Sequence, residues 1–512
     1  MFLCTSDKRL VGEGHCPARF FMSCGPPESR APGYLYKPAE TWYHTKNDCK
    51  EKVEFSMKLR IKETDSRKTV QLLFLIAAGI VIFPAILADA LFPAYGTTLL
   101  REYILVPCML FLGSALSQRL SPTAKKCLLL SGVMVVWFTA VQMKHYSQQM
   151  GLGYFGMFLV AYLLAFPYAA VAEEGRKATG LTWIGGFYFA YSLVMVVLAG
   201  MLLLDAVPEG LAGTVKWEGA RASLISHPNG GGCIMMLGIG FNLYFLTGAK
   251  KKWVKGLLAV LAALQFGVLT LTNSRTTILL ACALFGGTLF FVIWNGSWKR
   301  FLAGAAAAVL VIGVLFSLSG AVFRFHREAQ ISKLLEGETD FTENQYIYID
   351  EDTGAYVIAG SDGTAQSEIS QDMGTLNGRT YIWEAAFTTL QDNPALKIWG
   401  TEYVSAELSY RNPFPVVNAH NSWIQTMMLM GIPGCLLAVV FTLVAVWNLW
   451  ILMWRKQEDL SRKVVAMIVI CLLLAGLLEA YLFTGELLFT NFVFLLCMGY
   501  LIQWNAETTG KA

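Results

Sequence analysis

The amino-acid sequence predicts an all-α polytopic membrane protein. Hydrophobic residues make up 55% of its 512 positions and charged residues only 15%, whereas a soluble domain carries about 25% charged residues. Continuous apolar runs recur along the chain, and at about 20 residues each is long enough to cross a hydrocarbon core about 30 Å thick. Because these runs do not alternate with period two, they argue against a β-barrel.

We predict about 12 transmembrane helices, with a large extracytoplasmic loop between helices 9 and 10. The predicted spans are 69–94, 99–117, 125–144, 153–173, 180–205, 231–249, 253–272, 275–295, 300–322, 424–454, 463–484 and 487–504. The expected domains are a disordered tail at 1–68, helices 1–9 at 69–322, the loop at 323–420, helices 10–12 at 421–505 and a tail at 506–512. The first tail lacks the apolar segment of a signal peptide, and Met57, before the basic "KLRIKETDSRK", is an alternative start.

The basic residues give the orientation, because Lys and Arg concentrate in short cytoplasmic loops. With the first tail inside, the inward loops are "SQRLSPTAKK", "EEGRKATG", "GAKKKWVK", "NGSWKR" and "WRKQEDLSRK", and each contains basic residues. The outward turns, such as "HYSQQMGLG" and "YLFTGE", carry few basic residues. Both termini are therefore expected in the cytoplasm, in a multi-pass protein of the cytoplasmic (inner) membrane. The net charge of +4 then reflects topology and not nucleic-acid binding.

The large outer loop has two dissimilar halves. The first half is acidic, and its "YIYIDEDTGAYVIAG" alternates around a turn, which predicts a β-hairpin. In the second half, "GRTYIWEAAFTTLQDNP" has apolar residues at helical spacing and ends at Pro394. This pattern predicts a short helix lying along the membrane face.

Three arginines on the predicted outer side are candidates for chemistry. Arg221 lies in the outer segment 206–230, Arg275 in the tight turn of "LTNSRTTILL", and Arg379 opens the predicted loop helix. Arg at a membrane edge is costly unless paired or hydrated, and its guanidinium makes charge-assisted, bidentate bonds to phosphate. We therefore expect a lipid-linked pyrophosphate to bind here without a metal. The alternatives are snorkelling and an ion pair with an acid such as Glu384 or Glu402.

His420 lies at the predicted start of a late span, where Asn418, Asn421 or Ser422 could cap the helix. A histidine reachable from outside can act as a general base on a hydroxyl, and the helix N-terminus favours a nearby anion. The alternative is an interfacial histidine that only hydrogen-bonds a neighbour.

Several other signals have simpler interpretations. Aromatic residues near the outer edge, Trp383 and Trp423 among them, fit an interfacial belt first and sugar stacking second. "DED" at 350–352 fits a solvated turn better than a metal site, and "GGG" at 230–232 has no nucleotide-binding frame. The four tail cysteines fit no CxxC pair, so zinc is not expected. No metal or cofactor is predicted.

Four motifs together resemble the O-antigen ligase family of membrane glycosyltransferases, the Wzy_C type. They are "SRTTILLA" at a span start, "GRTYIW" in the outer loop, "NPALKIWGTE" after it, and "HNSWIQTMMLMGIPG" entering the next span. The last is similar to the family's spacing of His420, Asn421, Gly431 and Gly434, and "SHPNGGG" is similar to its Pro-Asn segment. The stretch "GCLLAVV" after Gly434 lacks the small hydroxyl residues of some ligases.

The resemblance implies transfer of a glycan from an undecaprenyl-diphosphate-linked donor to an acceptor on the outer face, without nucleotide sugar or metal. His420 would activate the acceptor hydroxyl, and Arg275 and Arg221 would hold the diphosphate. Arg379, Asn421, Glu402 and Trp383 are the expected substrate contacts. The acceptor stays open among a glycan, a lipid and a wall polymer, so a ligase, a polymerase and a protein-glycosylating enzyme are all compatible. A transporter or flippase of lipid-linked sugars is the non-enzyme alternative, and it should instead show charged or broken-helix sites at the midplane.

Overall fold

The computed structural model describes residues 120–145, 158–173, 178–218, 221–224, 228–294, 297–336, 345–349, 356–360, 379–411, 416, 418–455, 458–483 and 488–509, with a few positions between 69 and 112. The predicted N-terminal tail, most of the first two predicted spans, the histidine of "SHPNGGG" (His227) and the "DED" turn lie outside the described residues.

Within those ranges, eight helices are long and apolar enough to cross a membrane. They are α5 (Pro122–Lys144), α8 (Thr179–Leu203), α9 (Pro228–Gly248), α10 (Lys252–Leu271), α11 (Arg275–Ile293), α12 (Trp298–Glu336), α16 (Ser422–Met453) and α17 (Leu460–Leu478). Each coincides with a predicted span. The prediction of an all-α polytopic membrane protein is confirmed, and the count of about 12 helices stays a prediction.

Shorter or less apolar elements complete the described chain. A π-helix, η4 (Val160–Ala165), runs into α7 (Phe166–Ala172), and α18 (Leu488–Thr508) lies beside them. A 3-10 turn, η5 (Glu209–Leu211), precedes the antiparallel strands β1 (Val215–Glu218) and β2 (Arg221–Leu224). The predicted outer loop contains strands β3 (Gln345–Ile349) and β4 (Tyr356–Gly360) and helices α13 (Arg379–Asp392), α14 (Pro394–Trp399) and α15 (Val404–Arg411).

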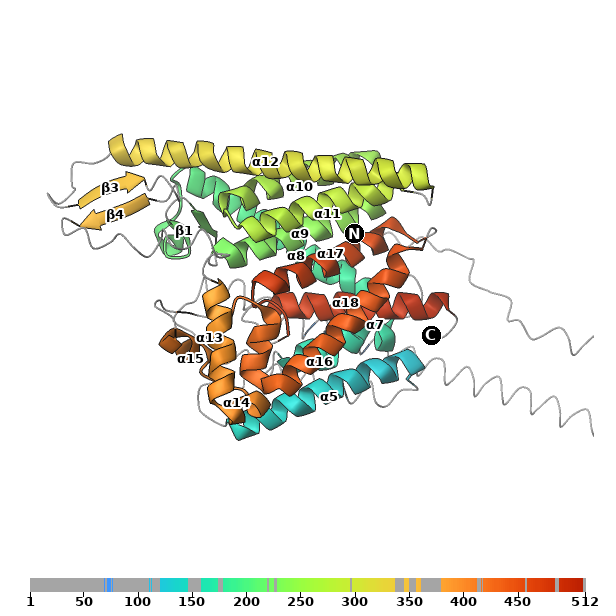
Figure 1. The fold of residues 1–512 in the computed structure, drawn as a ribbon. Helices are drawn as coiled ribbons and strands as arrows, with labels where there is room; N and C mark the ends of the chain where they lie inside the picture. Colours follow the sequence, from blue (N-terminus) through green and yellow to red (C-terminus); the bar gives the residue numbers. More distant parts are fainter. Residues whose placement is uncertain are drawn as a thin grey trace, which may run out of the picture. The chain divides into compact units, whose positions relative to one another are not determined.

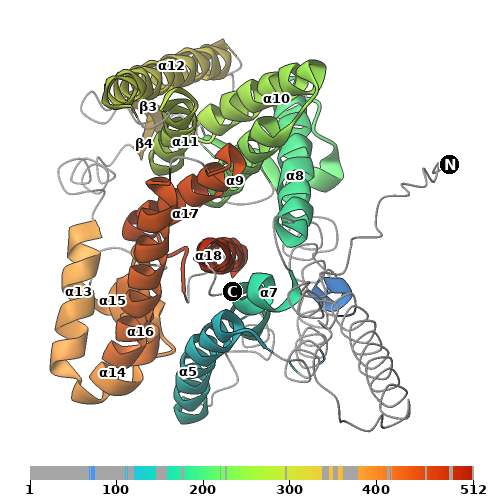
Figure 2. The ribbon, with the colours of Figure 1, turned by 90° about the vertical axis from the view of Figure 1, so that its right-hand side faces the viewer.

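The core of one part of the bundle is built around α9, which packs against α8, α10, α11 and α17 (Figure 2). Its glycines make this possible because they carry no side chain at the crossings. A Cβ at Gly232 would meet Ser274 and Thr277, one at Gly238 would meet Ser192, and one at Gly240 would meet Ile468. Gly232 of the "GGG" run, Gly238 and Gly240 therefore serve helix packing.

The predicted outer loop agrees with the structure in two elements and differs in one. The β3–β4 hairpin pairs Gln345 with Gly360, and α13 ends at Asp392, just before Pro394, so the hairpin and the helix are both confirmed. That the helix lies along the membrane face stays a prediction. Figure 1 shows α13 lying across the direction of the long helices. The difference is α12, which continues to Glu336, so the first part of the predicted 323–420 loop is helical.

The predicted span 424–454 is two helical arms and not one helix. Gly431 has non-helical dihedrals, φ 70° and ψ −176°, and Trp423 Nε1 donates to Thr442 Oγ1 at 3.1 Å. In a straight helix those residues would be separated by about 28 Å. The arm 422–430 therefore folds back along the arm 432–453, which brings the start of α16 alongside its middle.

The break in α16 is held by the end of α14. A Cβ on Gly431 would collide with the backbone of Ile398, and a Cβ on Gly400 would collide with the backbone of Leu429. Both glycines have φ near +70°, a conformation that glycine adopts readily. The carbonyls exposed at the break are paired, since Thr401 N donates to Met428 O at 2.6 Å and Trp137 Nε1 donates to Met430 O at 2.9 Å. We call this reciprocal contact the glycine crossing.

Candidate functional site

Three charged or titratable side chains from distant parts of the chain meet at one carboxylate. Arg379 Nη2 lies 2.6 Å from Glu479 Oε1, and His420 Nδ1 lies 3.0 Å from Glu479 Oε2. The side chains of Arg379 and Glu479 are 12% and 8% exposed, whereas that of His420 is 30% exposed. The carboxylate is thus enclosed while the imidazole keeps an accessible edge.

Local backbone geometry fixes His420. Its φ is 46°, in the left-handed region that non-glycine residues seldom adopt. The backbone is held there by His420 N donating to Asn418 Oδ1 at 2.8 Å, and Trp383 Nε1 donates to the preceding carbonyl, that of Ala419, at 2.9 Å. A strained residue held by several contacts at a charged cluster suggests a function.

The start of α16 is joined to the end of α17 just below His420. Asn421 Oδ1 accepts from Trp423 N and Ile424 N, so the predicted helix cap is confirmed, and Asn421 Nδ2 donates to Leu477 O at 3.0 Å. Ser422 Oγ donates to Glu479 O at 2.9 Å and accepts from Leu482 N at 3.0 Å. Both the oxygen and the nitrogen of the Asn421 side-chain amide are therefore hydrogen-bonded. Together with the Ser422 bonds, they hold the segment that carries His420 against the end of α17.

The acid at the centre also determines which imidazole nitrogen is available. An ionised carboxylate only accepts hydrogen bonds, and Glu479 forms an ion pair with Arg379. Nδ1 of a neutral His420 then carries the proton, and Nε2 is left as the basic nitrogen. This is the arrangement in which a carboxylate orients a histidine general base.

Arg221 is connected to this cluster through one asparagine. Arg221 Nε donates to Thr272 O at 3.0 Å and NH2 donates to Asn229 Oδ1 at 2.7 Å, while Tyr481 OH donates to Asn229 O at 3.2 Å. Tyr481 lies two positions after Glu479, so Asn229 links Arg221 to the segment that carries this carboxylate.

Arg275 opens α11, three positions after the Thr272 carbonyl that binds Arg221. Its side chain is exposed, and it has no hydrogen-bond or ion-pair partner among the residues that the structure describes. The structure thus brings Arg221 to the turn that carries Arg275. It brings Arg379 to His420, but no contact joins Arg275 to His420 within the described chain.

One sequence expectation needs correcting, and one residue was undervalued. The acid paired with Arg379 is Glu479, not Glu384 or Glu402. Glu384 is exposed on α13, and Glu402 lies between α14 and α15. The signal for Glu479 was its position in the apolar stretch "LLLAGLLEAYLF", because a carboxylate there is costly unless a cation pairs with it.

A resident metal has no obvious place in the described part of the chain, where no three His, Cys, Asp or Glu side chains cluster in a way that could hold an ion. The local chemistry is that of guanidinium, imidazole and carboxylate groups at helix ends. Such a set can bind an anion and accept a proton.

Part of the chain matches a known protein family. Residues 257–439 match the family model described as O-antigen ligase, and no curated protein matches the chain. The matched stretch contains Arg275, Arg379 and His420, whereas Arg221 and Glu479 lie outside it.

Proposed function

We propose that this chain transfers a glycan from undecaprenyl diphosphate to an acceptor hydroxyl. The chain belongs to the O-antigen ligase family and so is a membrane enzyme of the ligase or polymerase type. The reaction takes place on the outer face of the cytoplasmic membrane. The observation that carries the proposal is the contact of Arg379 and His420 with one enclosed carboxylate, Glu479.

In the proposed reaction, the acceptor oxygen attacks the sugar carbon that bears the diphosphate. A new carbon–oxygen bond forms, and the bond between that carbon and the diphosphate oxygen breaks. The electron pair of the broken bond leaves with the diphosphate. The hydroxyl proton passes to Nε2 of His420, and Glu479 stabilises the imidazolium that results.

The arginines have the complementary task of neutralising the departing diphosphate. Arg275 is exposed and follows the turn whose Thr272 carbonyl accepts a hydrogen bond from Arg221. The two arginines can therefore present several N–H donors to phosphate oxygens. The N-terminus of α11 adds a partial positive charge at the same place. Arg379 is engaged by Glu479, which suits a role in holding the acid and base together beside the leaving group.

The acceptor distinguishes the variants of this proposal. A ligase uses a glycan, lipid or wall-polymer hydroxyl, a polymerase uses a second lipid-linked repeat, and a protein glycosyltransferase uses a side-chain hydroxyl. All three need the same base and the same leaving-group cations, so the contacts of Glu479 support the shared chemistry.

The transporter alternative draws on the broken helix α16, since broken helices form binding sites in many transporters. Here, however, the break is filled by protein: Thr401 N and Trp137 Nε1 take the freed carbonyls of Met428 and Met430. The polar network among the described spans, Ser192, Gln265 and Asn242, is uncharged. These features favour a glycan-transferring enzyme over a transporter.

The test is reconstitution of the purified protein with undecaprenyl-diphosphate glycan and a panel of candidate acceptors. Wild type should release undecaprenyl diphosphate in the presence of one acceptor, and His420→Ala should lower that rate by about 10²-fold or more. Arg275→Ala should also slow release, because an exposed phosphate ligand is lost. Equal release by wild type and both variants would end the proposal.

A further inference from the structure

The hairpin of β1 and β2 carries Arg221 on one of its two faces. Successive side chains of a strand point to opposite faces, and residues paired across antiparallel strands share a face. Ala222 follows Arg221 in β2 and is paired with Trp217 of β1. Trp217 and Arg221 therefore lie on opposite faces of the hairpin. Both faces are covered, because Leu224 on the Trp217 face and Ser223 on the Arg221 face are buried.

The Arg221 face contacts the turn that precedes α11. Arg221 donates to the carbonyl of Thr272 at 3.0 Å and to Asn229 Oδ1 at 2.7 Å. Thr272 caps the end of α10, and Arg275 begins α11. The place of the Arg221 guanidinium relative to this turn therefore depends on how closely the hairpin is held against it.

The Trp217 face contacts α12, and Figure 1 shows β1 beside the C-terminal half of that helix. The centroids of the Trp217 indole and the His326 imidazole lie 4.3 Å apart, with 33° between the ring planes. The indole N–H of Trp217 is buried and has no hydrogen-bond acceptor within the described part of the chain. Trp217 is therefore held by ring packing against His326 and not by a directed hydrogen bond.

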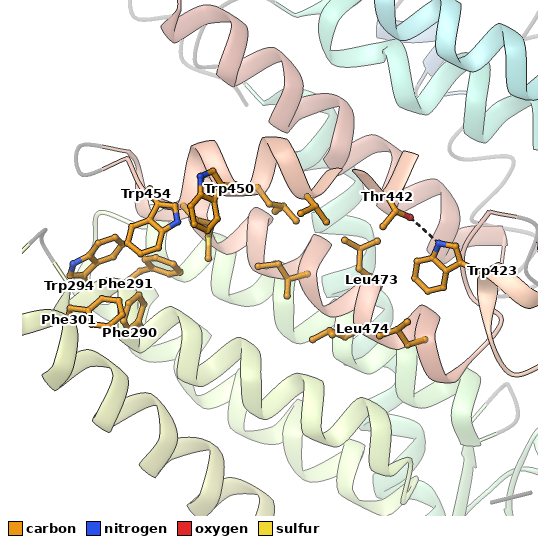
Figure 3. A pocket seen from close by; sticks show the side chains of 15 residues that line it. Phe290, Phe291, Trp294, Phe301, Trp423, Thr442, Trp450, Trp454, Leu473 and Leu474 are labelled. Atoms are coloured by element: carbon orange, nitrogen blue, oxygen red, sulfur yellow. Dashed lines mark hydrogen bonds between the residues drawn. The ribbon is translucent and has the colours of Figure 1, made fainter. Parts of the chain in front are cut away.

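α12 is a firm support for this contact because it packs along α11. Near the start of α12, the Phe301 ring lies edge-on to the rings of Phe290 and Trp294, with centroids 5.4 Å and 5.9 Å away (Figure 3). Farther along, a Cβ added to Gly286 of α11 would meet Ile312 of α12. Contacts at two levels fix the register of the pair, so the C-terminal half of α12 keeps its place beside the hairpin.

We propose that Trp217 and His326 are positioning residues for Arg221. Their stack holds the hairpin between α12 and the turn before α11, and so holds the Arg221 guanidinium where it binds the diphosphate of the donor. Neither ring needs to touch the diphosphate. Ring packing suits this task because it fixes a position without placing a carboxylate beside the guanidinium, where it would compete with phosphate. The inference rests on the proposed function, which supplies the diphosphate as the ligand of Arg221.

The test measures the dissociation constant of undecaprenyl diphosphate for the full-length protein in nanodiscs. Arg221→Ala should weaken binding by about tenfold or more, because charge-assisted hydrogen bonds to phosphate are lost. His326→Ala and Trp217→Ala should each weaken it by about three- to tenfold, the effect expected when an aromatic pair is lost. His326→Phe retains a ring in the stack, so its binding should stay within about twofold of wild type.

The matched control is Phe325→Ala on the same helix. Phe325 precedes His326 and is 76% exposed, so this change removes a ring from the adjacent position without removing the stack. Its binding should stay at the wild-type level. The melting temperature of each variant checks that it is folded.

A double-mutant cycle separates positioning from a general loss of structure. Once Arg221 is replaced by alanine, His326→Ala should weaken binding no further, because the residue that it positions is absent. A purely structural role of His326 would weaken binding by the same factor in both backgrounds, and that result would overturn the inference. So would a His326→Phe variant that binds as weakly as His326→Ala.

The proposed function and this inference fail in different ways. Wild type that binds no undecaprenyl diphosphate, or binds it equally well after Arg221→Ala, contradicts the role of Arg221 in the proposed function, and this inference falls with it. If Arg221→Ala weakens binding while His326→Ala and Trp217→Ala leave it at the wild-type level, only the inference fails.

Discussion

Two glutamates in this protein are equally buried, with a whole-residue exposure of 6% each, yet they are held in opposite ways. Glu173, at the corner between α7 and α8, accepts from neutral donors: Tyr168 OH at 3.1 Å, Thr179 N at 3.1 Å and Gly180 N at 2.8 Å. Glu479, at the end of α17, instead meets the side chains of Arg379 and His420.

The two carboxyl groups differ in the donors that they accept hydrogen bonds from. Glu173 takes up backbone N–H groups in the first turn of α8, which have no partner inside the helix, so it closes a corner of the fold. Glu479 brings a guanidinium and an imidazole together, and the imidazole remains 30% exposed. Burial alone therefore does not distinguish the two acids. The charge of their partners and the access of those partners to the outside do, and on these grounds we propose Glu479 as the functional acid.

The largest expected effect separates the two acids by activity. Glu479→Gln should lower the glycan-transfer rate by about 10²-fold or more, because the amide neither fixes the His420 tautomer nor stabilises the imidazolium. The matched change Glu173→Gln should leave the rate within about twofold of wild type, since each group it contacts is neutral. Initial rates with the reconstituted enzyme check both, and comparable losses in the two variants would remove the distinction.

The next effect tests whether the glycine crossing positions His420 against Glu479. Gly431→Ala should destabilise the protein by at least about 1–3 kcal/mol for the left-handed backbone alone, and the displaced arm 422–430 should carry His420 away from Glu479. The control is Gly267→Ala in α10, where a Cβ would meet nothing within 4 Å. The melting temperature and the transfer rate should both fall in Gly431→Ala, and both should stay at the wild-type level in Gly267→Ala. An unchanged Gly431→Ala enzyme would show that the crossing does not position the site.

The smallest effect concerns pH and the Glu173 corner. Burial raises the pKa of Glu173 above the ordinary value of 4.5, so the folded state retains a proton that the unfolded state has released. The stability that this provides is complete below pH 4.5 and declines as pH rises through the raised pKa. Glu173→Gln cannot ionise, so its Tm should decline less than that of wild type above pH 4.5. If Tm falls with pH to the same extent in wild type and in Glu173→Gln, the raised pKa of Glu173 is contradicted.

Local sequence patterns were sufficient for the elements whose causes are local. Continuous apolar runs predict the spans, alternation around a turn predicts β3–β4, and Pro394 marks the end of α13. The cap at Asn421 follows from side-chain chemistry within three residues. Hydropathy could not predict the break in α16, because both arms are apolar and the break depends on what packs against Gly431.

The sequence by itself determined that this protein crosses a membrane with helices, and it identified Arg221, Arg275, Arg379 and His420 as candidates for chemistry. Burial of apolar surface and backbone hydrogen bonding depend on nearby residues, so composition and periodicity are enough for such conclusions. Only the tertiary structure decided that Glu479 joins His420 and Arg379, which lie 59 and 100 positions away. Which helix ends meet depends on the packing of the whole bundle, and no local pattern in the chain encodes it.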